Sequence, residues 1–277
     1  MAHAVRQGVR VEGAQAWLLV LLLALALVAW LVTGDRMEGM DTGPGTELGT
    51  LGFYVGSWVV MMAAMMFPSV APAVRAYSHE HRRRARAESP VRGGATGALF
   101  VAGYLVTWTA VGLAAFGMFE AVQQLDIAWL SWDRGGRYVA AGLVVGAGAY
   151  ELTPAKDACL RGCRHPFDRL ADRWRDGLSG SLILGIEHGC WCIGCCAGLM
   201  VVLFALGVMS VGWMIFVAAL IAIEKLAPWD RGPTLAIAAL LLVLGIAVAV
   251  APDSVPGLTI PGGDGGGMGP AMEMQMG

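Results

Sequence analysis

Four methionines lie within six residues of one apolar stretch, which concentrates thioether sulfur in a single place. They are Met61, Met62, Met65 and Met66. At 100° per residue, their side chains leave a helix within an arc of roughly 140°. Thioethers on one side of a helix are suited to a soft metal. Methionine is also a flexible filler of apolar cores, so packing is the alternative interpretation.

A second stretch combines imidazole and thiol groups. Its members are His188, Cys192, Cys195 and Cys196. Their i, i+4, i+7, i+8 spacing places them on one helical stripe about 100° wide, whereas Cys190 points elsewhere. An ionisable pair, Glu187 and His188, precedes the thiols, and an ionisable group at membrane depth costs roughly 3 kcal/mol on insertion scales. This cost favours a functional role, and the alternative is packing of small residues with a capping acid.

Thioether, thiolate and imidazole ligands together form a soft donor set. Such a set suits Cu(I) best and zinc second, and it disfavours magnesium and calcium. The thioethers favour copper, because zinc prefers a tetrahedral set of nitrogen and thiolate ligands. We therefore predict one metal site that draws on both stretches, near the centre of the bilayer.

Two smaller groups have less specific interpretations. Cys159 and Cys163 lie among basic residues, where they form either a thiol pair, a metal relay or part of a plain lipid-headgroup loop. Glu224 and Lys225 are interpreted as a local ion pair or as a helix end whose side chains reach the interface.

The composition indicates the elements that must position these groups. The chain is 57% hydrophobic and 14% charged, whereas a soluble domain carries about 25% charged residues. About 20 apolar residues are needed to cross a bilayer. Stretches near that length lie at residues 16–33, 51–74, 97–119, 136–152, 180–204, 209–227 and 233–251. We predict an all-α, polytopic transmembrane bundle of about seven helices.

The distribution of basic residues predicts the orientation of this bundle. With seven spans and the N-terminus inside, 16 of the 19 basic residues lie in inner segments. This bias is typical of cytoplasmic loops. We expect a cytoplasmic segment at 1–15, a transmembrane domain at 16–251 and a disordered, Gly- and Met-rich outer tail at 252–277. The expected location is the bacterial inner (plasma) membrane.

The combined motifs resemble those of an uncharacterised bacterial family of predicted metal-binding integral membrane proteins, a domain family of unknown function. The resemblance covers roughly residues 50–250. It rests on the run from Trp58 to Pro72, on the segment from Thr153 to Arg164 and on Gly189 to Met200. Gly207-Val208-Met209, Trp213-Met214 and Glu224-Lys225 extend it. It implies a helical membrane fold with a metal site at those Met and Cys positions, and it implies no reaction.

The leading hypothesis is a membrane protein that binds Cu(I) for copper transport, or for delivery and assembly of a copper site. We expect the lipid bilayer and a metal ion as partners, with a membrane complex or a copper-acceptor protein besides, and no nucleic acid. An intramembrane thiol redox protein and a non-catalytic subunit of a larger complex are the alternatives. No phosphate-binding loop is present, so we do not expect ATP-driven pumping by this chain. We also expect no enzymatic activity.

Overall fold

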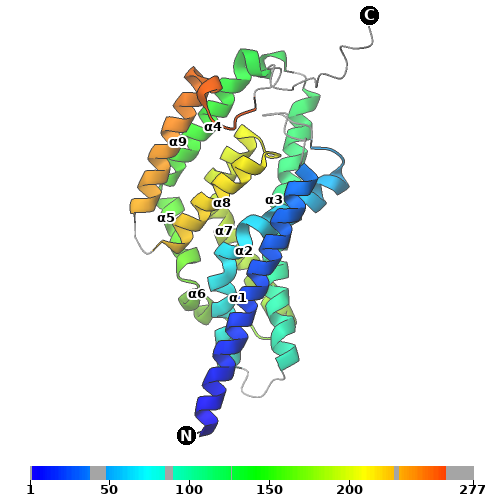
Figure 1. Ribbon diagram of the computed structural model, residues 1–277, viewed down its shortest axis with the longest axis vertical. Coiled ribbons are helices and arrows are strands. Elements are labelled where there is room, and N and C mark those ends of the chain that lie inside the picture. The colour runs from blue at the N-terminus through cyan, green and yellow to red at the C-terminus, as the bar shows by residue number, and fades with distance from the viewer. Residues whose placement is uncertain (1, 38–47, 85–89, 126, 228–230, 260–277) are drawn as a thin grey trace, which may run out of the picture.

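The computed structural model describes residues 2–37, 48–84, 90–125, 127–227 and 231–259, and in these segments every element is helical (Figure 1). The long helices are α1 (Ala2–Met37), α2 (Leu51–Arg84), α3 (Pro90–Gln124) and α7 (Gly177–Leu206). The shorter ones are α4 (Arg137–Glu151), α5 (Pro154–Arg164), α6 (Pro166–Asp172), α8 (Val211–Leu226) and α9 (Gly232–Val250). The start of α1 and the end of α9 lie at opposite ends of the bundle (Figure 1).

Five of these helices are long and apolar enough to cross a membrane, namely α1, α2, α3, α7 and α9. The other two predicted spans fall on α4 and α8, which have 15 and 16 residues. An α-helix rises 1.5 Å per residue, so these two helices are about 23 and 24 Å long, shorter than about 30 Å of hydrocarbon. The all-helical class is confirmed, and the count of seven spans stays a prediction.

Two segments predicted to lie outside the membrane spans contain helices. The predicted cytoplasmic segment 1–15 continues into α1, which begins at Ala2. The basic segment 156–175 forms α5 and α6 instead of a plain loop. The cause at α5 is local: Thr153 caps the helix by accepting from the backbone N–H of Lys156, and Pro154 occupies the first turn.

The predicted outer tail begins with a short 3-10 turn, η3 (Pro252–Ser254). The next residue, Val255, is buried. The start of this tail therefore packs against the bundle. The rest of it, residues 260–277, lies outside the described residues.

Helices α3 and α7 approach each other backbone to backbone. A Cβ on Gly103 would overlap the carbonyl oxygen of Leu182, and a Cβ on Gly185 would overlap that of Phe100. Glycine allows this approach because it has no side chain at the contact. The close packing fixes the register that places Tyr104 of α3 beside the cysteines of α7.

Helix α7 runs through the middle of the bundle and packs against α3, α4, α5 and α8. Helix α2 packs against α1, α3, α6 and α8. The two sulfur-bearing helices are therefore joined mainly through α3 and α8, which contact both.

Candidate metal centre

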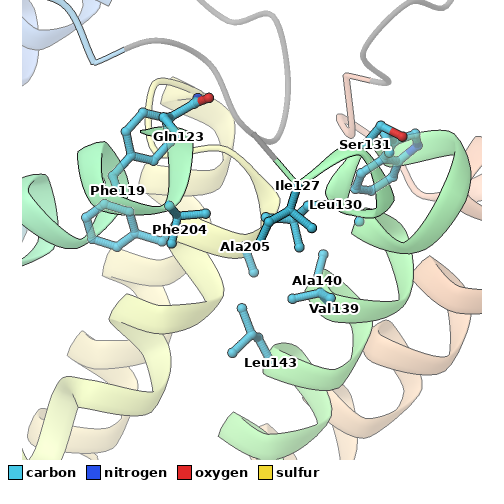
Figure 2. Close-up of a pocket in the computed structure, with 13 residues that line it drawn as sticks. Phe119, Gln123, Ile127, Leu130, Ser131, Val139, Ala140, Leu143, Phe204 and Ala205 are labelled. Atoms are coloured by element: carbon cyan, nitrogen blue, oxygen red, sulfur yellow. The ribbon is translucent and has the colours of Figure 1, made fainter. Parts of the chain in front are cut away.

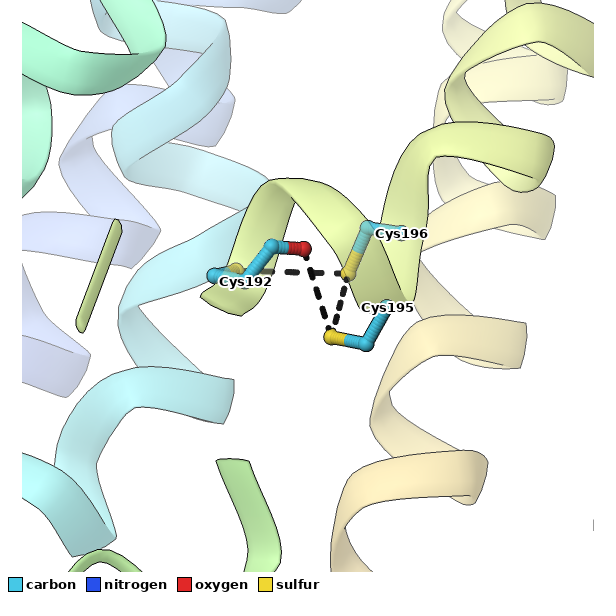
Figure 3. Close-up of side chains that lie close together, drawn as sticks. All are labelled: Cys192, Cys195 and Cys196. Atoms are coloured by element: carbon cyan, nitrogen blue, oxygen red, sulfur yellow. Dashed lines mark hydrogen bonds between the residues drawn. The ribbon is translucent and has the colours of Figure 1, made fainter. Parts of the chain in front are cut away.

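Three cysteines of α7 bring their thiols together in the buried core. The Sγ atoms of Cys192, Cys195 and Cys196 all lie within 4.8 Å of one another. Cys195 and Cys196 are 3.5 Å apart, and Cys192 and Cys196 are 4.0 Å apart (Figure 3). All three are buried, as expected for positions on one stripe of the helix. Cys190 lies on the exposed face of the same helix.

This spacing suits a single metal ion. With metal–sulfur bonds of about 2.3 Å, two sulfurs in a tetrahedral site are about 3.8 Å apart, and two in a trigonal site about 4.0 Å. The measured separations of 3.5 and 4.0 Å bracket these values closely. Two of the three separations therefore suit one soft ion, and the third is within 4.8 Å.

A fourth thiol comes from another helix. The Sγ of Cys163, on α5, lies 3.4 Å from the Sγ of Cys195. Sequence reasoning treated Cys163 as part of a separate basic segment and missed this contact. The available signal was the i, i+4 spacing of Cys159 and Cys163, which places both on one face of a helix. Gly194 makes the approach possible, because the Cys159 side chain occupies the space that a Cβ at position 194 would fill.

Lys225 and Tyr104 both contact Cys192. The Lys225 Nζ lies 3.0 Å from the Cys192 Sγ, and the Tyr104 hydroxyl lies 3.1 Å from it. The interpretation of Glu224 and Lys225 as a local pair is wrong, since the two side chains diverge by about 100° around α8. The ammonium instead lies where it stabilises negative charge on sulfur.

Glu224 belongs to a buried charge group. Lys156 Nζ donates to Glu151 and, at 2.8 Å, to Glu224 Oε2, and the side chains of all three residues are at most 2% exposed. Burial by itself lowers the pKa of Lys156, but the two carboxylates outweigh it and hold that pKa above its ordinary value. Arg164 Nε donates to the Glu224 backbone carbonyl at 2.8 Å. These ion pairs and hydrogen bonds connect α4, α5 and α8 beside the three cysteines.

The predicted ligand His188 lies beside the cluster of three α7 cysteines and is not part of it. The His188 ring packs against those of Phe100 and Tyr104, with centroids 5.9 and 6.0 Å away. Within the described residues, the group of closely spaced metal-ligand types contains the three α7 cysteines and not His188. His188 therefore contacts Tyr104, which in turn contacts Cys192.

The four predicted methionines are all buried, but they are spread along α2. Met61 lines a small cavity with Met209, which follows the C-terminal end of α7. Cys196 is ten residues before that end, about 15 Å along the helix axis. Further along α2 toward its C-terminal end, the Ser69 Oγ lies 3.4 Å from the Lys225 Nζ, which also contacts Cys192. Met65 and Met66 are therefore about one turn from the level of Cys192, and Cys195 and Cys196 lie about one turn along α7 toward them.

The cavity between α3 and α4 is of a different kind (Figure 2). Apolar side chains dominate its lining, and its polar groups come from Gln123, Ser131 and Trp132. Its described lining contains no cysteine, histidine, methionine or charged residue. The side chains that line this cavity do not suit a metal. The cluster of three α7 cysteines therefore remains the candidate centre.

Comparison with protein families agrees with this donor chemistry. Residues 55–248 match the model of the family described as PpoB2, copper chaperone. The chain belongs to this copper chaperone family. The matched region contains all four thiols of the candidate centre, together with Lys225 and Tyr104. No curated protein and no solved structure matches the chain.

Proposed function

We propose that this protein is a multi-pass membrane copper chaperone that binds Cu(I) at the thiols of Cys192, Cys195 and Cys196 and passes it to an acceptor. Cys163 serves as a fourth thiol that receives or releases the ion. The protein acts by binding and transfer and not as an enzyme. The single observation that carries the proposal is three buried thiols within 4.8 Å of one another, in a chain of a copper chaperone family.

Copper(I) fits the donors better than zinc does. The thiols are soft, and thioethers rather than carboxylates line the neighbouring turns of α2. A metal holds its cysteine ligands deprotonated, and the Lys225 ammonium offsets part of the resulting negative charge. A Cu(I) ion with three thiolates carries a net charge of −2, which the ammonium reduces to −1.

The level of the thiols in the bundle supports delivery toward one side. Lys225, which contacts Cys192, is one residue from the end of α8 at Leu226. The group therefore lies level with one end of α8 rather than with its middle. Arg164 contacts the backbone carbonyl of Glu224 in the last turn of α8. Because basic residues favour the cytoplasmic side, we place the thiols near the cytoplasmic face, with the N-terminus inside and the C-terminus outside.

Copper binding to the purified protein tests the proposal directly. The full chain in detergent is loaded anaerobically with Cu(I), and bound metal is measured by mass spectrometry against a chelator of known affinity. We expect Cys192→Ser, Cys195→Ser and Cys196→Ser each to lower the affinity by at least tenfold. The matched control is Cys190→Ser, which changes an exposed thiol on the same helix. Unchanged binding in all three buried variants would remove the site.

One contact favours a second candidate function, thiol redox chemistry. The Sγ atoms of Cys163 and Cys195 lie 3.4 Å apart on different helices, whereas neighbouring cysteines on one helix form a disulfide with difficulty. A disulfide between α5 and α7 would consume two thiols and require a disulfide or quinone oxidant. A metal-independent mass shift after alkylation, lost in Cys163→Ser, would favour this function over copper delivery.

A further inference from the structure

A small cavity at the other end of the bundle gathers methionines from three parts of the chain. Met37 ends α1, Met61 lies on α2, and Met209 lies in the turn between α7 and α8. The cavity is small, with a volume of ≈ 10 Å³. All three methionines are at most 4% exposed. Residues this far apart in sequence meet here because α7 ends at Gly207, whose φ of 133° permits a tight turn against α2.

Two buried hydroxyl groups of the same cavity have no hydrogen-bond partner among the residues that the structure describes. They belong to Tyr54 and Ser57, which lie on α2 one to two turns before Met61 and are 2% and 3% exposed. A buried hydroxyl without a partner costs free energy, and native structures pair almost all such groups. Methionine packing alone does not account for this cost. A bound cation does account for it, because a cation accepts lone pairs from both thioether sulfur and hydroxyl oxygen.

We propose that this cavity is a second, thioether-type Cu(I) site, formed by Met37, Met61 and Met209 with the hydroxyls of Tyr54 and Ser57. Thioether sulfur selects Cu(I) among biological metals. Among the described residues, no carboxylate lines the cavity, and this favours a monovalent ion over a divalent one. The exposed Arg36 guanidinium faces Gly56 on the adjacent side of α2, where water screens its charge.

The position of the cavity indicates its role relative to the thiols. Met209 lies three residues beyond the end of α7, whereas Cys196 lies ten residues before that end, which is about 15 Å of helix axis. Along α2, Met62, Met65 and Met66 continue from Met61 toward Ser69, which shares Lys225 with Cys192. Neutral thioethers bind Cu(I) more weakly than thiolates do. An ion held first by the methionines would therefore lower its free energy by moving to the cysteines.

This inference takes copper from the proposed function as the cargo, but its test separates the two sites. Cu(I) stoichiometry is measured on the purified full chain, on the variant with Cys192, Cys195 and Cys196 all changed to Ser, and on Met61→Leu/Met209→Leu in both backgrounds. Methionine to leucine nearly conserves volume. Met214→Leu serves as the control, because Met214 is buried in α8 and does not line the cavity.

We expect two ions per wild-type chain and one in the triple-Ser variant, with a sulfur shell in its copper X-ray absorption spectrum. Adding the double methionine change to the triple-Ser variant should remove the remaining ion, whereas Met214→Leu should not. A triple-Ser protein that is folded by size exclusion yet binds no copper overturns the methionine site and leaves the thiol site standing. Retention of the ion in the combined variant also overturns it. If the cysteine changes lower no binding while the methionine changes do, the thiol proposal fails and the methionine site stands.

Discussion

Replacing Lys225 by methionine should weaken Cu(I) binding at the thiols with little change of shape. The Lys225 Nζ lies 3.0 Å from the Cys192 Sγ, and both groups lie inside the bundle. A hydrogen bond to a charged group contributes about 1.5–3 kcal/mol. Each 1.4 kcal/mol is a factor of ten in affinity, so we expect the Cu(I) dissociation constant to rise about 10- to 140-fold. The reason is that the bound thiolates lose the cation that offsets part of their negative charge.

The assay is anaerobic competition with a Cu(I) chelator on the purified protein. Lys225→Arg keeps the positive charge and should lose less affinity than Lys225→Met. Arg231→Gln is the control for removal of a basic residue, because the Arg231 side chain is 76% exposed and pairs with Asp157 at the surface. An unchanged dissociation constant in folded Lys225→Met would refute the role of the ammonium, and an equal loss in Arg231→Gln would attribute the effect to net charge alone.

Three further outcomes follow from the same geometry. Lys156→Met leaves two buried carboxylates without their cation and should destabilise the protein by about 3–5 kcal/mol, measured by unfolding in detergent; an unchanged midpoint would contradict this. Gly185→Ala pushes a methyl group into the α3 backbone and should cost about 1–3 kcal/mol in the same assay, while Gly146→Ala, with open space at its Cβ, should not. Cu(I) affinity should fall as pH is lowered, because protons compete for the thiolates, and Cys163→Ser should reduce the number of protons released on binding; a release equal to wild type would show that Cys163 is no ligand.

The local pattern was sufficient for the long apolar helices and for the stripe of three cysteines on α7. A 3.6-residue period fixes which side chains share a face, so Cys192, Cys195 and Cys196 could be placed together from spacing alone. The same reasoning could not find Cys163, because its approach to Cys195 depends on how α5 packs against α7 near Gly194. It also missed α5 itself, where a polar, basic composition concealed a capped amphipathic helix.

For the methionines, the local pattern predicted one shared site, whereas the structure places them beside different neighbours. Their spacing on α2 is compatible with one shared site, but a face of a helix more than one turn long meets different neighbours along its length. Met61 therefore reaches Met37 and Met209, while residues two turns later reach the level of Lys225. Glu224 and Lys225 are adjacent in sequence, yet one joins a charge group with Lys156 and the other contacts Cys192.

By itself, the sequence determined that the chain is helical, where its long apolar helices lie and that its sulfur is concentrated on α2 and α7. These properties depend on interactions between residues a few positions apart. The tertiary structure decided which thiols and thioethers meet, where Lys225 points and how far apart the two sulfur groups lie. Those outcomes depend on backbone contacts such as Gly103 with α7 and Gly185 with α3, which join residues about 80 positions apart and leave no periodic signal in the chain.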